Sequence, residues 1–195
     1  MSILIAMCLY SLSMSISPGP VNMTILSGAV NFGFKRSFSF ITGATVGFTL
    51  LLIAVGLGVS AWVGRLPAFD DFLRVAGTGY MCYIGCKIIV SRPDLESREN
   101  GPPTFSHGFL MQLLNPKAWI ACLSGTAAFS LNTSAVRLWA FVAIYLIICY
   151  LSLAAWGYLG SKMQFLARVK NGIRIFNLSA GGALITVAIY LFITS

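Results

Sequence analysis

Long uncharged stretches dominate the pattern of apolar and polar positions along this chain of 195 residues. A helix needs about 20 mostly apolar residues to cross the hydrocarbon core of a bilayer. Four stretches of at least that length contain no Asp, Glu, Lys or Arg: residues 1–34, 37–64, 138–161 and 175–195. Two further apolar stretches, 72–90 and 105–131, carry few charges. Each stretch predicts one crossing, so the pattern indicates an all-α membrane protein with six transmembrane helices.

Proline interrupts the first and fourth of these predicted spans. The interruptions are the run Ser17, Pro18, Gly19 and Pro20 and the run Asn115, Pro116 and Lys117. Proline has no backbone N–H and ends the helical hydrogen-bond ladder, so nearby carbonyls and amides must face protein, water or a ligand. We therefore expect spans 1 and 4 to be broken helices, span 2 to run over about 38–63, and spans 5 and 6, at about 138–159 and 173–194, to be continuous.

The two breaks occupy corresponding positions in two halves of the chain. The string ILSGAVNF at 25–32 resembles CLSGTAAF at 122–129, an offset of 97 residues. Pro18 and Pro116 are 98 residues apart. The predicted domains are a first three-helix repeat (1–90), a polar cytoplasmic loop (91–104) and a second three-helix repeat (105–195). Because each half has three crossings, the second enters the membrane from the opposite side. The halves are thus expected to be inverted repeats, as in many transporters.

The basic residues predict the orientation of the chain. Apolar residues make up 57% of the sequence and charged residues 9%, with a net charge of +8. Nine of the 13 Lys and Arg residues lie between spans 1 and 2, 3 and 4, or 5 and 6, and three lie in the other connections. Basic residues favour the cytoplasmic side, so we expect an inner (plasma) membrane protein with both termini outside. Since the charges lie between spans, no nucleic-acid partner is expected. The expected partner of the chain's apolar surface is the lipid bilayer.

The two breaks together form the candidate binding site. Where a span is broken, half-helix N-termini offer N–H groups to an anion and unwound carbonyls accept a cation. An amino acid carries both charges. Lys117 is an ionisable side chain deep in a predicted span, where an unpaired charge costs about 2.5 to 3.5 kcal/mol. The positive charge of Lys117 is therefore expected to interact with either a substrate carboxylate or carbonyls of the broken helix. The candidate substrate-binding residues are Pro18, Gly19, Pro20, Asn22, Gln112, Asn115, Pro116 and Lys117.

Other residue types indicate packing rather than chemistry. Small residues let transmembrane helices approach closely, and we assign this role to Gly43, Gly47, Gly77 and Gly85. All five cysteines lie in predicted spans and the chain has one histidine, so neither a disulfide framework nor a metal site is indicated. No catalytic residues and no cofactor are expected, and the chain is not expected to be an enzyme. No predicted span contains Asp or Glu, so proton coupling would use Asp70, Asp71, Lys117 or the substrate itself.

Four segments carry a family resemblance. They are SPGP at 17–20, NFGFKRSFSFITGATVGF at 31–48, AGTGYMCYIG at 76–85 and GFLMQLLNPKAW at 108–119. With these segments the chain resembles, nearly end to end, the lysine exporter and homoserine/threonine exporter (LysE/RhtB) family. The resemblance implies a compact bundle of six helices that exports amino acids from the cytoplasm, driven by the proton-motive force, without a soluble cofactor.

The resemblance also bears on substrate and partners. Exporters of basic amino acids in the wider family use acidic residues in their spans, which this chain lacks. The departure favours neutral, zwitterionic amino acids such as homoserine, threonine, leucine or cysteine. Protons and a second copy of the chain, in a homodimer, are candidate partners.

Three other functions remain open from the residues alone. A membrane thiol or electron carrier of related architecture needs two reactive cysteines beside the proline breaks, whereas Cys8 and Cys122 are several residues away. A metal-ion exporter needs converging carboxylate, histidine or thiolate ligands. A membrane scaffold without transport would use the glycines for packing and the prolines as kinks.

Overall fold

The computed structural model describes residues 3–58, 75, 78–79, 82–83, 85–90, 101–163 and 171–194. Regular structure in these residues is helical, in agreement with the all-α prediction. The helices are α1 (Ile3–Ile16), α2 (Pro20–Phe32), α3 (Phe34–Gly56), α6 (Phe105–Leu113), α7 (Pro116–Phe129), α8 (Ala135–Lys162) and α9 (Gly172–Thr194), with a short 3-10 helix η2 (Leu131–Thr133) before α8.

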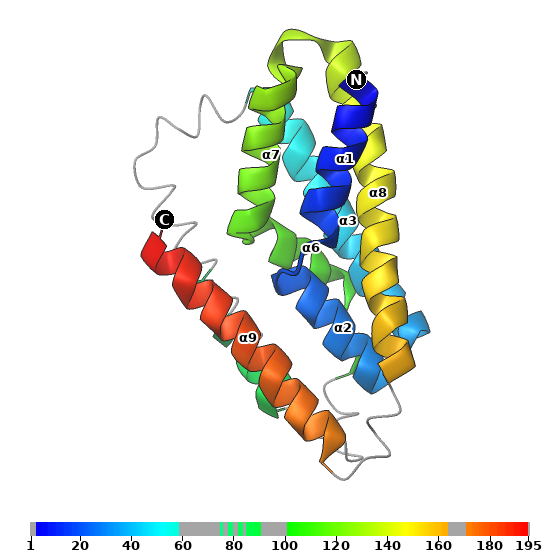
Figure 1. Cartoon of the computed structure of the whole chain (residues 1–195), viewed down its shortest axis with the longest axis vertical. Helices are drawn as coiled ribbons and strands as arrows, with labels where there is room; N and C mark the ends of the chain where they lie inside the picture. The colour runs from blue at the N-terminus through cyan, green and yellow to red at the C-terminus, as the bar shows by residue number, and fades with distance from the viewer. Residues whose placement is uncertain are drawn as a thin grey trace.

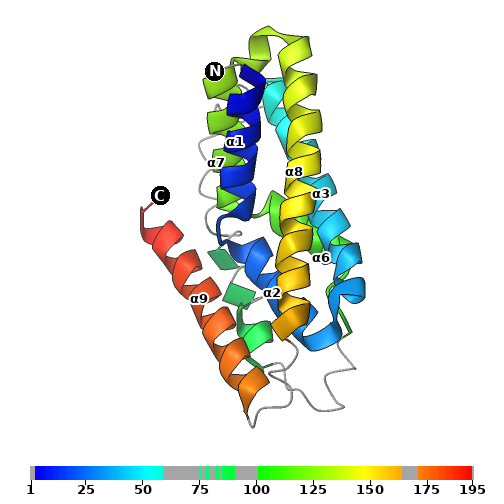
Figure 2. The ribbon, with the colours of Figure 1, turned by 45° about the vertical axis from the view of Figure 1, so that its right-hand side comes forward.

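The helices form a bundle around α3 and α8. Helices α1, α3, α7 and α8 stand side by side, α2 and α6 lie toward the opposite end from the N-terminus, and α9 runs obliquely along one side (Figure 1). Helix α8 packs against α1, α2 and α3, and α3 packs most extensively against α6. The turned view shows the same arrangement, with α9 leaning against the α2 end of the bundle (Figure 2).

Two described helices, α3 and α8, are each long and apolar enough to cross a membrane. Helices α1 and α2 meet the same criterion as a pair, bent by 58° at their break. About half of the third predicted span (72–90), most of the 91–104 loop, Gly77 and all five acidic residues lie outside the described residues. Within the part of the chain described, the membrane protein is therefore multi-pass.

The boundary between the first two spans differs from the predicted one. We placed the start of span 2 near Phe38, after the charged pair Lys35 and Arg36, but α3 begins at Phe34. Gly33 separates α2 from α3 with a φ of 88°, a conformation that glycine adopts without strain. Its N–H caps the carbonyl of Ala29. The glycine turn therefore sets the boundary, and the basic pair lies in the first turn of α3.

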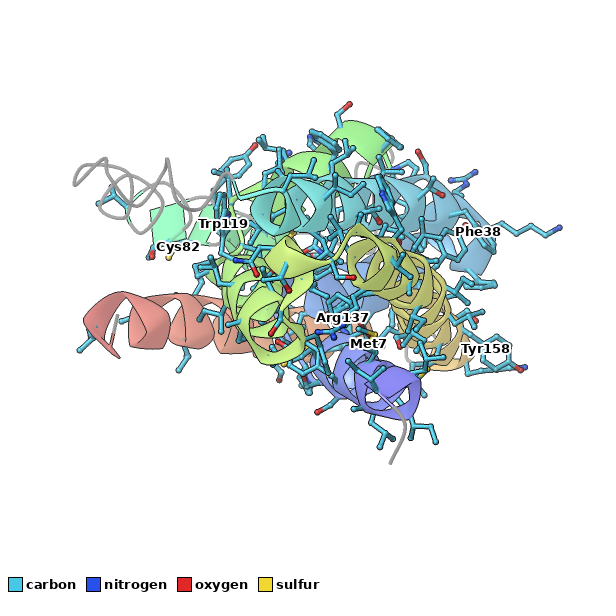
Figure 3. All side chains as sticks on the ribbon, turned by 90° about the horizontal axis from the view of Figure 1, so that it is seen from above. Met7, Phe38, Cys82, Trp119, Arg137 and Tyr158 are labelled. Carbon is cyan, nitrogen blue, oxygen red and sulfur yellow. The ribbon has the colours of Figure 1, made fainter. Side chains whose placement is uncertain are left out.

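Apolar side chains cover both the inside and the outside of the bundle. Met7 and Phe141 are buried, whereas Leu9, Leu50 and Leu151 are about half exposed. The view from above places Met7 toward the middle of the bundle and Phe38 and Tyr158 at its periphery (Figure 3). An outer surface of this kind suits a hydrocarbon environment, in which helix association depends on close packing rather than on hydrophobicity.

Glycines permit the close crossing of α3 and α6. A Cβ added at Gly43 would overlap the carbonyl of Phe105, and one at Gly108 would overlap the carbonyl of Phe40. At Gly47 an added Cβ would lie 2.8 Å from the Phe109 oxygen. The two backbones are thus in close contact at both Gly43 and Gly47 of α3. Gly85 makes a similar approach to α9, where its Cβ would lie 2.6 Å from Cγ1 of Ile185.

Candidate functional site

The first helix break lies between Ile16, the last residue of α1, and Pro20, the first of α2. Gly19 there is fully extended, with φ −162° and ψ 177°. The two prolines lack the N–H groups that would otherwise satisfy the last carbonyls of α1. Other elements supply donors instead: Asn22 Nδ2 donates to the Ser15 carbonyl at 2.9 Å, and Trp156 Nε1 donates to the Ile16 carbonyl at 3.1 Å.

Lys117 satisfies the remaining groups of this break from the other half of the chain. Its ammonium donates to the carbonyl of Ser17 at 2.7 Å, to the Ser17 hydroxyl at 2.8 Å and to the Pro18 carbonyl at 3.4 Å. A Cβ at Gly19 would lie 3.2 Å from Nζ, so the glycine leaves room for the ammonium. Lys117 therefore hydrogen-bonds carbonyls, one of the two kinds of partner expected for it.

The second break lies between Leu113, the last residue of α6, and Pro116, the first of α7. Asn115 caps α7: its side chain accepts from the Lys117 backbone N–H at 3.1 Å. The Asn115 amide also donates to Gln112 Oε1 at 3.1 Å. Trp119 Nε1 donates to the freed carbonyl of Leu113 at 2.8 Å. Proline in the first turn needs no partner for its nitrogen. The hydrogen bonds described at this break therefore all come from residues within a few positions of it.

The two breaks lie about halfway along the bundle (Figure 1), and residues beside both of them line one small cavity. Its volume is about 30 Å³, room for about two water molecules. The cavity is lined by Met14, Ser15, Val21, Asn22, Phe48, Gln112, Asn115, Lys117, Ala118, Ala121, Tyr145, Cys149 and Leu153.

The predicted site residues divide into two groups. Four of them line the cavity: Asn22, Gln112, Asn115 and Lys117. The other four, Pro18, Gly19, Pro20 and Pro116, shape the two breaks and are not among the lining residues. Asn22, Gln112 and Asn115 are each 5% exposed, which shows that the polar groups are enclosed by protein.

Positive and negative groups meet beside the cavity. The N-terminus of α2 has no side-chain cap, and its residues Val21 and Asn22 line the cavity. A helix N-terminus carries partial positive charge, and the Lys117 ammonium adds a full one. The carbonyls of Ser17 and Pro18, which are not among the lining residues, accept hydrogen bonds from this ammonium. The described residues include no Asp or Glu, so no carboxylate among them neutralises Lys117.

Residues from α1, α3 and α8 complete the cavity without having been predicted from the sequence. Phe48 and Tyr145 stack at 4.3 Å and form one wall. Ser15 and Cys149 add a hydroxyl and a thiol, and Trp156 caps the first break from 140 residues away. No local motif marks these side chains, because only the packing of α8 against α1 and α3 brings them to the breaks.

Comparison with known proteins identifies the chain. A family model described as LysE type translocator matches residues 12–195, almost the whole length. The chain belongs to the LysE type translocator family. In this translocator, Asn115 and Lys117 of the second break line the cavity, and Lys117 hydrogen-bonds the Ser17 carbonyl of the first break.

The curated relatives of this LysE-family translocator include efflux proteins. The cysteine/O-acetylserine efflux proteins of Escherichia coli (strain K12) and Shigella sonnei (strain Ss046) are 28% identical to it over 139 residues, 71% of this chain and 71% of each relative. The protein of the same name from Escherichia coli O1:K1 / APEC has the same identity and coverage. No solved structure matches the chain.

Proposed function

We propose that this translocator exports small neutral amino acids from the cytoplasm across the inner membrane. One observation carries the proposal: both helix breaks open on a single cavity, and Lys117 of one break hydrogen-bonds the carbonyls of the other. A site with paired positive and negative poles suits a zwitterion. The named activity of the efflux relatives, at 28% identity, supports the same class of function.

The zwitterion is bound through its two charged groups. In this proposal the substrate carboxylate lies between the Lys117 ammonium and the uncapped N-terminus of α2. The substrate ammonium binds the carbonyls of Ser17 and Pro18, to which Lys117 donates in the structure. Asn22, Gln112 and Asn115 orient the molecule from the cavity walls. On binding, the substrate ammonium thus replaces the Lys117 ammonium at the carbonyls that follow α1.

The same poles account for the preference for neutral amino acids. A basic side chain would bring a second cation beside Lys117 with no acidic residue among the described residues to balance it. Burying such an unpaired charge is costly. Homoserine, threonine, leucine and cysteine carry no side-chain charge and fit the proposal, with the proton-motive force as the driving gradient.

Two inverted repeats, 1–90 and 105–195, with six spans between them form the proposed architecture. The direction of the chain supports it: α1 and α2 run away from the N-terminal end of the bundle, whereas α6 and α7 run back toward it (Figure 1). The first helices of the two halves would then cross the membrane in opposite senses, each broken at its prolines. Residues 91–104 form the cytoplasmic loop between the repeats.

The proposed function is tested with purified protein in lipid vesicles loaded with labelled amino acids. We expect efflux of threonine or homoserine well above that of protein-free vesicles, faster with an inward proton gradient, and little efflux of lysine or glutamate. Absence of efflux for every amino acid tried would contradict the exporter and favour the scaffold. An efflux rate that is the same with and without the proton gradient would contradict only the proposed driving force.

The proposed orientation predicts which connections are accessible from outside. Asn132 is exposed between α7 and α8, at the same end of the bundle as the N-terminus (Figure 1), and Ser106 is exposed at the start of α6. In a cysteine-free background, we expect Asn132→Cys to react with a membrane-impermeant maleimide applied to the periplasmic side. Ser106→Cys should react only after the cells are permeabilised. The reverse labelling pattern would place the termini in the cytoplasm.

A further inference from the structure

Ser15 is a buried hydroxyl without a hydrogen-bond partner. It is 7% exposed, lines the cavity, and its Oγ makes no hydrogen bond. Two nearby serines behave differently: Ser11 on α1 donates to the Met7 carbonyl at 2.8 Å, and Ser17, just after α1, donates to the Met14 carbonyl at 3.2 Å. Serines in helices normally bond back to the preceding turn in this way. The Ser15 hydroxyl is instead available to a molecule in the cavity.

The surroundings of Ser15 are polar on one side and apolar on the other. The Cys149 thiol and the Tyr145 hydroxyl of α8 are the polar neighbours of Ser15, but neither has the geometry of a hydrogen bond to its Oγ. Both residues line the cavity. Cys149 is 3% exposed. Leu153 and Phe48 form an apolar wall close by. Ser15 and Cys149 provide an uncharged hydroxyl and thiol, which suit a substrate's side chain, whereas the Lys117 ammonium and the N-terminus of α2 suit its carboxylate.

We propose that Ser15 and Cys149 form the side-chain subsite of the cavity, which selects small amino acids with a side-chain hydroxyl or thiol over aliphatic amino acids of the same size. The inference rests on the proposed export of neutral amino acids and narrows it. A substrate hydroxyl supplies the hydrogen-bond partner that the Ser15 Oγ lacks. An aliphatic side chain leaves this hydroxyl buried and unsatisfied, which is unfavourable.

Threonine and valine form the decisive pair of substrates, because they share a shape and differ in one hydroxyl. A single net hydrogen bond corresponds to a preference of up to about tenfold. We expect the wild-type protein in vesicles to export threonine about tenfold more efficiently than valine, as the ratio of initial rates at low, equal substrate concentrations. In Ser15→Ala the ratio should fall to about two or less, mainly through faster valine export.

Thr126 provides a matched control. It is also a buried hydroxyl without a partner, but it is not among the residues lining the cavity. Thr126→Val should leave the threonine-to-valine ratio unchanged. Ser15→Cys, which retains a weak donor, should give an intermediate ratio. A merely structural role of Ser15 would alter both transport rates together and leave the ratio as it is.

The outcomes separate the subsite from the exporter. Export of both amino acids with the same ratio in wild type and Ser15→Ala would overturn the subsite and leave the proposed function intact. An equal loss of preference in Thr126→Val would also overturn it, because the effect would then not be specific to the cavity. If the wild-type protein exports no amino acid, the proposed function fails and the subsite fails with it.

Discussion

We expect Lys117→Ala to lose efflux while the protein still inserts into the membrane. The substitution removes the proposed partner of the substrate carboxylate from a site that has no acidic or basic substitute among the described residues. Removing one partner of an enclosed, hydrogen-bonded charge pair costs about 2 to 5 kcal/mol, roughly 30-fold to several thousandfold in affinity. The measurement is the initial rate of threonine efflux from vesicles, with protein insertion quantified in the same preparation.

The ammonium also links α1 to α7, so binding must be separated from folding. Thermal unfolding in detergent, with and without threonine, makes this distinction: we expect substrate to raise the Tm of the wild type but not that of Lys117→Met. Lys162, exposed in the last turn of α8, provides the matched control, and Lys162→Ala should keep both efflux and the substrate-induced shift. Normal efflux by Lys117→Ala and Lys117→Met would rule out the proposed site.

The second large effect is expected at the crossing of α3 and α6. Alanine normally stabilises a helix relative to glycine by about 1 kcal/mol. At Gly43 the new Cβ would overlap the Phe105 carbonyl, and overpacking of this kind costs about 1 to 3 kcal/mol. Because the obstructing group is backbone, it cannot rotate away. We therefore expect Gly43→Ala to be destabilising, and Gly43→Leu to prevent a stable fold, as measured by thermal unfolding in detergent.

Gly182 gives the control for this prediction. It lies within α9, and an added Cβ there would meet no atom within 4 Å. Gly182→Ala should leave the Tm unchanged or raise it slightly, as helix propensity alone predicts. Gly108→Ala, on the other side of the crossing, should lower the Tm as Gly43→Ala does. Equal Tm values for Gly43→Ala and Gly182→Ala would show that the helices separate without cost.

Proline acts locally on a helix, because it lacks the N–H that continues the hydrogen-bond ladder. Helices of the structure end at Ile16 and Leu113 and restart at Pro20 and Pro116. The predicted start of the second span lies four residues after the observed one. The charged pair at 35–36 does not mark this boundary; the turn at Gly33 does. A basic residue is tolerated in a first helical turn near a membrane surface, so its position does not define where a helix begins.

The candidate site was only partly predictable. The predictable residues form hydrogen bonds close to them in the sequence, and the others reach the site through the packing of distant helices. Asn22 and Asn115 could be found because each bonds within a few residues of its own break. Trp156 and Ser15 could not, since their roles depend on α8 lying against α1. Tryptophan and serine in an apolar segment have many ordinary roles, and nothing in the neighbouring sequence separates those roles from a place at a cavity.

The sequence by itself determined the membrane character of this protein, its helical class and its family. These follow from the composition of long segments and from short sequence motifs, both of which are local properties. Only the tertiary structure decided what the freed backbone groups bind. The ammonium of Lys117 reaches the carbonyl of Ser17 across 100 residues, and it does so because the packed helices bring both breaks to one cavity. Partners so distant in the chain are chosen by packing and by the high cost of an unsatisfied polar group in an apolar surrounding.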